Sequence, residues 1–114
     1  PTGAPYGAAA IETMQALGVY DALQAKIVQG NSIAQAFQFI DTGNAELGFV
    51  ALSQLAKVTD GSRWLVPQNL YKPIRQDAIL LKKAEKDEAS IAFLAFLKSP
   101  EARAIIEKFG YGLE

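Results

Sequence analysis

The stretch from Gly30 to Ser53 constrains the fold more than any other part of this sequence, because it encodes a helix with both ends marked. Ser32 is a typical N-cap, and Gly43 marks the end of the helix, since glycine readily accepts a left-handed backbone. Residues 46–51 follow as a mostly apolar segment, which predicts a strand covered on both faces. The apolar face of the helix has the i, i+3, i+4, i+7 spacing and consists of Ile33, Ala36, Phe37 and Ile40.

A capped helix start of this kind predicts an anion site. The first backbone N–H groups of a helix lack partners within it, and they lie at the positive end of the helix dipole. Ala4-Pro5-Tyr6-Gly7 leads into a second helix in a similar way. Two helix starts that converge on one anion would bind it better than either alone.

The rest of the chain alternates helical and strand-like patterns. We expect further helices or helical turns at residues 7–17, 20–25, 52–58, 87–97 and 99–110, and strands at residues 26–28, 46–51, 63–66 and 77–83, with a loop or crossing over 68–76. This alternation predicts an α/β fold with a mainly parallel sheet flanked by helices. The predicted inward or sheet-covering residues are Ile11, Met14, Leu17, Phe37, Phe39, Phe49, Trp64, Ala102, Ile105, Ile106 and Phe109.

Composition excludes several classes of function. The 114 residues suffice for about one domain, half of them are hydrophobic, and the net charge is −1. No basic block is present, so we expect no nucleic-acid binding. Cysteine and histidine are absent, which removes thiolate nucleophiles, the commonest general base and the commonest metal ligand. No phosphate-binding glycine loop is present and no run of residues is apolar enough to span a membrane, so we expect neither an enzyme, a cofactor nor membrane insertion.

Three segments together carry a family resemblance: APYGAAAIETMQALGVYDAL, NSIAQAFQFIDTGNAELGFVALS and FLKSPEARAIIEKFGYG. They resemble the periplasmic molybdate-binding proteins, the type II binding proteins that serve molybdate ABC transporters. The resemblance covers essentially the whole chain but only the C-terminal half of the family's length. It implies two α/β lobes with molybdate or tungstate in the cleft between them. Residues 1–72 would then be the second lobe, without its first strand, and residues 73–114 a crossing strand and C-terminal helices that return to the first lobe.

The same resemblance implies the site residues. Tyr6 falls at a ligand position in the loop before a helix, and Ile33 falls where a backbone N–H meets the oxyanion. Ala51 falls where some members have a tyrosine whose hydroxyl touches the ligand, and Tyr6 would supply a phenol in compensation. Ser32 is a helix cap first and a direct ligand second. Molybdenum would be held only as molybdate, through Tyr6 and Ile33. The plainer alternatives are core packing for Ile33 and a hydrophobic staple at the helix entrance for Tyr6.

The resemblance also implies a periplasmic location, a leader outside this chain and an ABC transporter permease as partner. The opening Pro1-Thr2-Gly3, without an initiator methionine, leads us to expect a piece of a longer polypeptide. A fragment of this kind would be prone to self-association. Two alternatives are the ligand-sensing domain of a transcription regulator and a self-associating fragment that binds no oxyanion.

Overall fold

The computed structural model describes residues 3–113, so Pro1 and Thr2, with which the sequence opens, and Glu114 lie outside the described residues. The chain divides into two compact units, the first ending at Ile74 and the second beginning at Arg75. The predicted boundary, after residue 72, lies close to this division. The assignment of the two parts to lobes of a larger protein stays a prediction.

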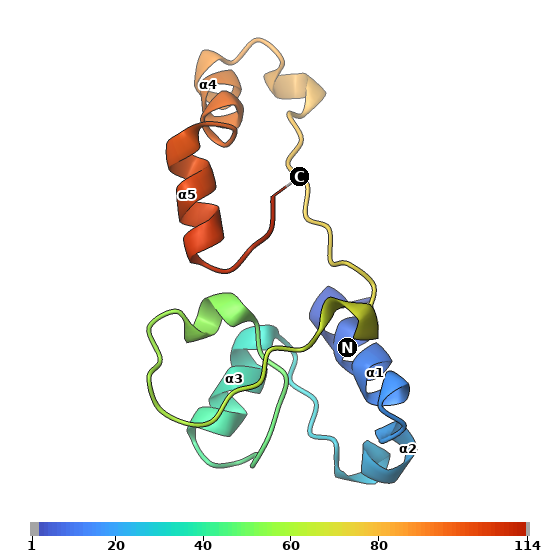
Figure 1. Ribbon diagram of the computed structural model, residues 1–114. Helices are drawn as coiled ribbons and strands as arrows, with labels where there is room; N and C mark the ends of the chain where they lie inside the picture. Colours follow the sequence, from blue (N-terminus) through green and yellow to red (C-terminus); the bar gives the residue numbers. More distant parts are fainter. Residues whose placement is uncertain (1–2, 114) are drawn as a thin grey trace. The chain divides into compact units, whose positions relative to one another are not determined.

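The first unit is built around three α-helices and the irregular segments that join them (Figure 1). These helices are α1 (Pro5–Ala16), α2 (Tyr20–Leu23) and α3 (Ile33–Asp41), and the short 3-10 turns are η1 (Gln24–Lys26), η2 (Leu52–Leu55) and η3 (Gln68–Leu70). Helix α1 packs against α2 and against η3. A hydrogen bond of 2.8 Å from the Lys72 amide to Glu12 Oε2 fastens the segment after η3 to α1. This hydrogen bond joins two residues that lie sixty positions apart in the sequence.

The second unit contains α4 (Glu88–Phe96), α5 (Pro100–Lys108) and the 3-10 turn η4 (Lys82–Ala84). Asp87 caps α4 by accepting from the Ser90 amide, and Ser99 caps α5 by accepting from the Ala102 amide. Proline at the first position of α5 fits the helix because its missing N–H would have no partner there. Residues 78–81, η4 and α4 enclose an open groove of about 510 Å³ with mostly apolar walls.

The predicted helices are confirmed, with small shifts at their ends. Helix α1 begins at Pro5, two residues before the predicted start, and the predicted short helix at 52–58 is the 3-10 turn η2. Gly18, Gly43 and Gly110 all adopt positive φ after their helices, as their predicted role of helix stop requires.

The predicted strands are not seen among the described residues. Residues 27–28, 46–51, 63–66 and 77–81 lack the ladder of backbone hydrogen bonds that defines a strand, and Lys26, Lys82 and Lys83 belong to 3-10 turns. A strand exists only beside a second strand, and none of these segments has a neighbouring strand within the described part of the chain. The mainly parallel sheet therefore stays a prediction.

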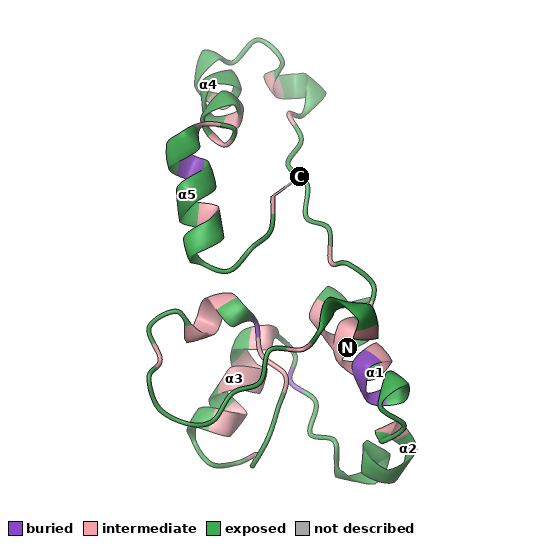
Figure 2. Cartoon of the chain, in the orientation of Figure 1, coloured by how far each residue is buried: buried purple, intermediate pink, exposed green. Residues whose placement is uncertain are grey.

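Burial is correspondingly sparse in the described residues (Figure 2). Met14, Ala51 and Ala102 are buried apolar residues, and Thr13 is buried with its hydroxyl donating to the Ala9 carbonyl at 2.8 Å. Predicted inward residues that are instead exposed are Ile11, Leu17, Trp64, Ile105 and Phe109. Trp64 and Leu65 fall on an expected strand that has no neighbouring strand among the described residues, and they are 62% and 71% exposed.

Candidate oxyanion site at the start of helix α3

The start of α3 is ordered by two reciprocal side-chain contacts. Ser32 has an extended backbone, and its Oγ accepts from the Gln35 amide at 3.2 Å, which confirms it as the N-cap. Gln35 reaches back in turn, and its Oε1 accepts from the Asn31 amide at 2.7 Å. This arrangement resembles a capping box, except that the returning Gln35 side chain bonds the amide of the residue before the N-cap. Both contacts hold the chain that enters the helix in one path.

Ile33 occupies the first helical position, directly after this cap. Its N–H has no carbonyl partner within the helix, because the first donors of any α-helix lie beyond the reach of its own acceptors. The first turn contains no acidic residue, and the sequence has no charged residue between Lys26 and Asp41. An anion at this end of α3 would therefore meet the positive end of the dipole without a competing carboxylate.

Gln54 joins this helix start to Ala51. Its Oε1 accepts from the Ala51 amide at 2.9 Å, and its Nε2 donates to the Ile33 carbonyl at 3.1 Å. Residues 33 and 51, two of the positions singled out in the sequence, are thus held together by one side chain. Ala51 is 5% exposed, and Ile33 and Gln54 are half-buried, so the bridge lies at the edge of the packed region.

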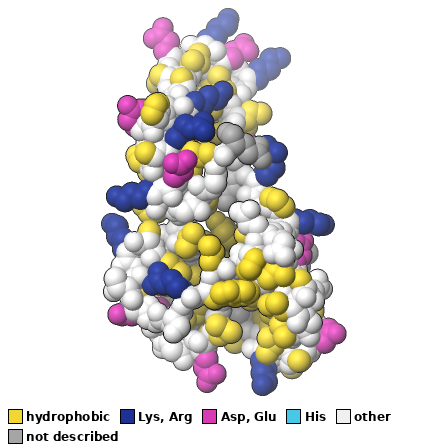
Figure 3. All heavy atoms as spheres, in the orientation of Figure 1, with side chains coloured by type: hydrophobic (Ala, Val, Ile, Leu, Met, Phe, Trp, Pro, Cys, Tyr) yellow, Lys and Arg dark blue, Asp and Glu magenta, His cyan; other side chains and the backbone are white. Residues whose placement is uncertain are grey.

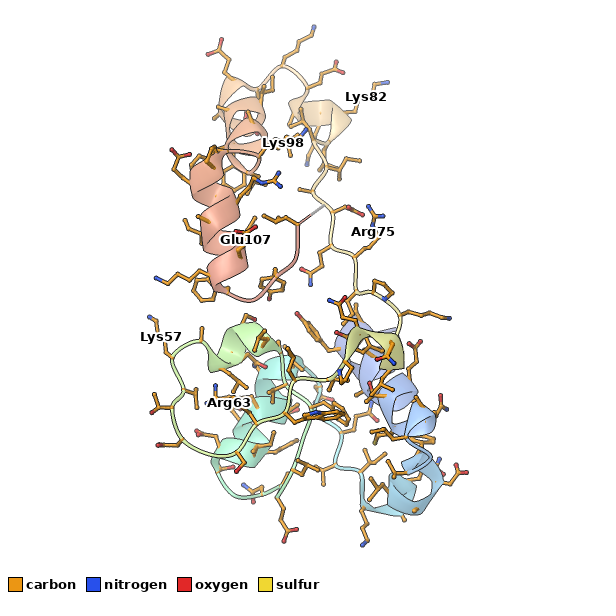
Figure 4. The ribbon with its side chains drawn as sticks, in the orientation of Figure 1. Lys57, Arg63, Arg75, Lys82, Lys98 and Glu107 are labelled. Atoms are coloured by element: carbon orange, nitrogen blue, oxygen red, sulfur yellow. The ribbon has the colours of Figure 1, made fainter. Side chains whose placement is uncertain are left out.

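The backbone around the bridge is closely packed. Gly30 is buried beside α3, and a Cβ at this position would lie 2.8 Å from the Ala36 nitrogen. Gly48 lies against the Ile40 side chain on the segment that leads to Ala51. Arg63 closes the loop after η2, donating to the Val58 carbonyl at 2.6 Å and to the Leu55 carbonyl at 3.4 Å (Figure 4). Turn η2 is thus fastened to α3 at one end and to its own loop at the other.

Tyr6 comes from a different element, as the second residue of α1. Its side chain is half-buried, and Ala4 at the N-cap offers no side-chain oxygen to the first turn. The predicted pair of helix starts therefore consists of one start with a side-chain cap and one without. The role of Tyr6 as a ligand-binding residue stays a prediction.

Sequence reasoning missed Gln35, Gln54 and Gly30. Gln35 could have been found from the sequence, because a serine followed three positions later by glutamine is a recognised pattern at the start of a helix. Gln54 carried no such signal, since its two partners are a backbone amide three residues away and a carbonyl twenty-one residues away.

The described residues include no cluster of acidic, histidine or cysteine side chains that could hold a metal ion.

The family follows from comparison with known proteins. A family model described as bacterial extracellular solute-binding protein matches residues 1–112. The chain belongs to this family. None of its described helices has the length and apolar character needed to cross a membrane.

Two similar proteins and one similar solved structure are named for molybdate. The chain is 60% identical to the molybdate-binding protein ModA of Rhodobacter capsulatus and 53% identical to that of Azotobacter vinelandii, in both cases over all of this chain and 45% and 46% of the relative. It also matches the solved structure of the Azotobacter vinelandii periplasmic molybdate-binding protein, with a TM-score of 0.86 and 40% identity over 96% of this chain and 50% of that one. These relatives are binding proteins rather than enzymes. The chain spans about half their length.

Proposed function

We propose that this chain supplies one wall of an oxyanion site in a periplasmic receptor for molybdate or tungstate, working with an ABC transporter permease. The observation that carries the proposal is the start of α3, where the Ile33 amide lies at an uncharged, capped helix end and Gln54 ties that end to Ala51. The names of the relatives supply the ligand class.

Neutral donors suit this ligand. Molybdate is a dianion at neutral pH and has no proton to give, so a site made of N–H and O–H groups can satisfy all of its oxygens. The Ile33 amide would donate from the helix start, the Tyr6 phenol from α1 and the Ser32 hydroxyl from the cap, since a hydroxyl that accepts one bond can still donate another. Sulfate has the same charge, so cavity size would separate the two ions.

The donors of this chain alone do not suffice for tight binding. A hydrogen bond to a charged group contributes about 1.5–3 kcal/mol, so two or three donors give roughly 3–9 kcal/mol. Association costs at least about 4 kcal/mol of this, whereas micromolar affinity needs about 8 kcal/mol net. We therefore propose that the site is complete only with a second lobe, and that the expected parallel sheet forms in that larger protein.

A second property follows from the exposed apolar surface. Hydrophobic side chains gather on the visible face of the first unit (Figure 3), and Leu47 of this unit is 87% exposed. In the second unit, Ile79 is 83% exposed. Patches of this kind usually mark surfaces that are covered by another part of a protein or by another molecule. We propose that the isolated 114-residue chain self-associates.

A chimera tests the receptor proposal. This chain replaces the matching stretch of the Rhodobacter capsulatus relative, and calorimetry measures the binding of molybdate, tungstate and sulfate. We expect micromolar or tighter binding of molybdate and tungstate, and much weaker binding of sulfate. A chimera that folds cooperatively but prefers sulfate, or binds none of the three, would contradict the proposal.

A further inference from the structure

We infer that Gln54 is a positioning residue for the oxyanion site, acting through the backbone of Ile33 and Ala51 rather than by touching the ligand. This inference rests on the proposed function. It concerns a residue that the family resemblance did not point to and that lies in a 3-10 turn rather than at a helix start.

The geometry of the amide leaves one arrangement. Gln54 Oε1 faces an N–H at 2.9 Å and Nε2 faces a C=O at 3.1 Å. An inverted amide would place its NH₂ against the Ala51 amide and its oxygen against the Ile33 carbonyl, and both bonds would be lost. The side chain therefore acts as a two-ended clamp of fixed length between η2 and α3.

The clamp acts on the backbone of two residues that the sequence placed at the site, Ile33 and Ala51. It binds the carbonyl of Ile33, whose own amide is the proposed donor, and the amide of Ala51, a position at which the family resemblance implies a ligand contact. Ser32 and Gln35 fix the chain before the helix through hydrogen bonds that join residues 31, 32 and 35. Gln54 is thus the described side chain that sets the distance between these two walls.

Arg63 makes the clamp effective. Because Arg63 holds the carbonyls of Leu55 and Val58, η2 cannot simply follow a change at its first residues. Loss of the Gln54 bonds would therefore let α3 and residue 51 separate rather than move together. We expect a displacement of this kind to weaken ligand binding, because the interaction depends on accurate placement of the donor groups.

The test uses the chimera described above with Gln54→Leu and Gln54→Glu. Leucine removes both bonds, and an ionised glutamate can still accept from Ala51 but cannot donate to Ile33. We expect molybdate affinity to fall about three- to tenfold for leucine and further for glutamate, which adds a negative charge near a dianion. Gln38→Leu is the matched control, since Gln38 lies on the exposed side of α3, and its affinity should equal that of the unsubstituted chimera.

A double-mutant cycle separates positioning from general stability. If Gln54 acts through the Ile33 peptide, Gln54→Leu should cost much less affinity in an Ile33→Pro background, whereas a purely structural effect would be additive. Additive losses, or unchanged affinity in Gln54→Leu, overturn the inference while the receptor function stands. If the unsubstituted chimera binds no molybdate, the proposed function fails and the inference with it.

Discussion

At the scale of single residues, the candidate site depends on backbone positions as much as on side chains. Ile33 would act through its N–H, Ala51 is held by its N–H, and Gly30 contributes by having no side chain. Sequence inspection found Ser32 as a helix cap because capping is a local signal, whereas the donor role of Ile33 was implied by the family resemblance and stays a prediction. Sequence inspection could not find Gln54 or Gly30, because their partners are brought close only by the fold.

Gly30→Ala should destabilise the first unit. The new Cβ would lie 2.8 Å from the Ala36 nitrogen and 3.1 Å from the Ser32 carbonyl oxygen, and backbone atoms cannot swing aside. We expect a loss of about 1–3 kcal/mol in the free energy of unfolding, measured by urea denaturation.

Gly48→Ala is the matched control for that substitution. Its Cβ would lie 2.6 Å from Ile40 Cδ1 and 3.1 Å from Ile40 Cγ1, and these side-chain atoms can move by a change of rotamer, so the loss should be smaller than at Gly30. Equal losses of unfolding free energy at the two glycines would contradict the prediction that the backbone contact of Gly30 with α3 makes its substitution more costly.

At the scale of elements, the predicted helices are confirmed, whereas the predicted strands are not seen among the described residues and the sheet stays a prediction. The helices carry their signals within themselves: Ser32, Asp87 and Ser99 cap them, and Gly18, Gly43 and Gly110 follow their ends. A strand depends on a neighbouring strand that is often far away in the sequence. The apolar pattern of a segment such as 63–66 can therefore be recognised, but the sequence does not show which segment it would pair with.

The cap of α4 should respond to acid. Hydrogen bonds from the Ser90 hydroxyl and then the Ser90 amide hold the pKa of Asp87 below its usual value of 3.8. Because the folded pKa is depressed, the ionised cap stabilises α4 above the usual pKa, and this contribution is lost as pH falls through the lower folded value.

Backbone NMR can follow this loss at the Ser90 amide, between about pH 6 and about pH 2. The Ala102 amide, capped by the non-titrating Ser99, is the internal control and should not follow the same curve. Asp87→Asn should abolish the titration of Ser90. A Ser90 amide that stays unchanged to the lowest pH would contradict this role for Asp87.

At the scale of the whole molecule, the exposed apolar groove of the second unit predicts self-association of the isolated chain. Phe93 lines this groove and is 63% exposed, so its replacement removes exposed apolar surface and should cost little folding stability. Sedimentation should show a mass that rises with concentration, and Phe93→Ser should lower it. The exposed Lys86→Ser serves as control. A concentration-independent monomer would refute the proposal.

The most direct test of the central claim removes the proposed donor N–H from the site and controls separately for the change of side chain. In the chimera, Ile33→Pro deletes the proposed donor N–H at a position where proline suits the helix, since Ser32 before it is already extended. Ile33→Ala deletes the side chain but keeps the N–H, and Glu88→Pro makes the same change at the first position of α4. We expect molybdate affinity by calorimetry to fall about tenfold or more for Ile33→Pro and to change little for the two controls. If Ile33→Pro binds molybdate as tightly as the unsubstituted chimera, the start of α3 is not the donor, and the account of this site is wrong.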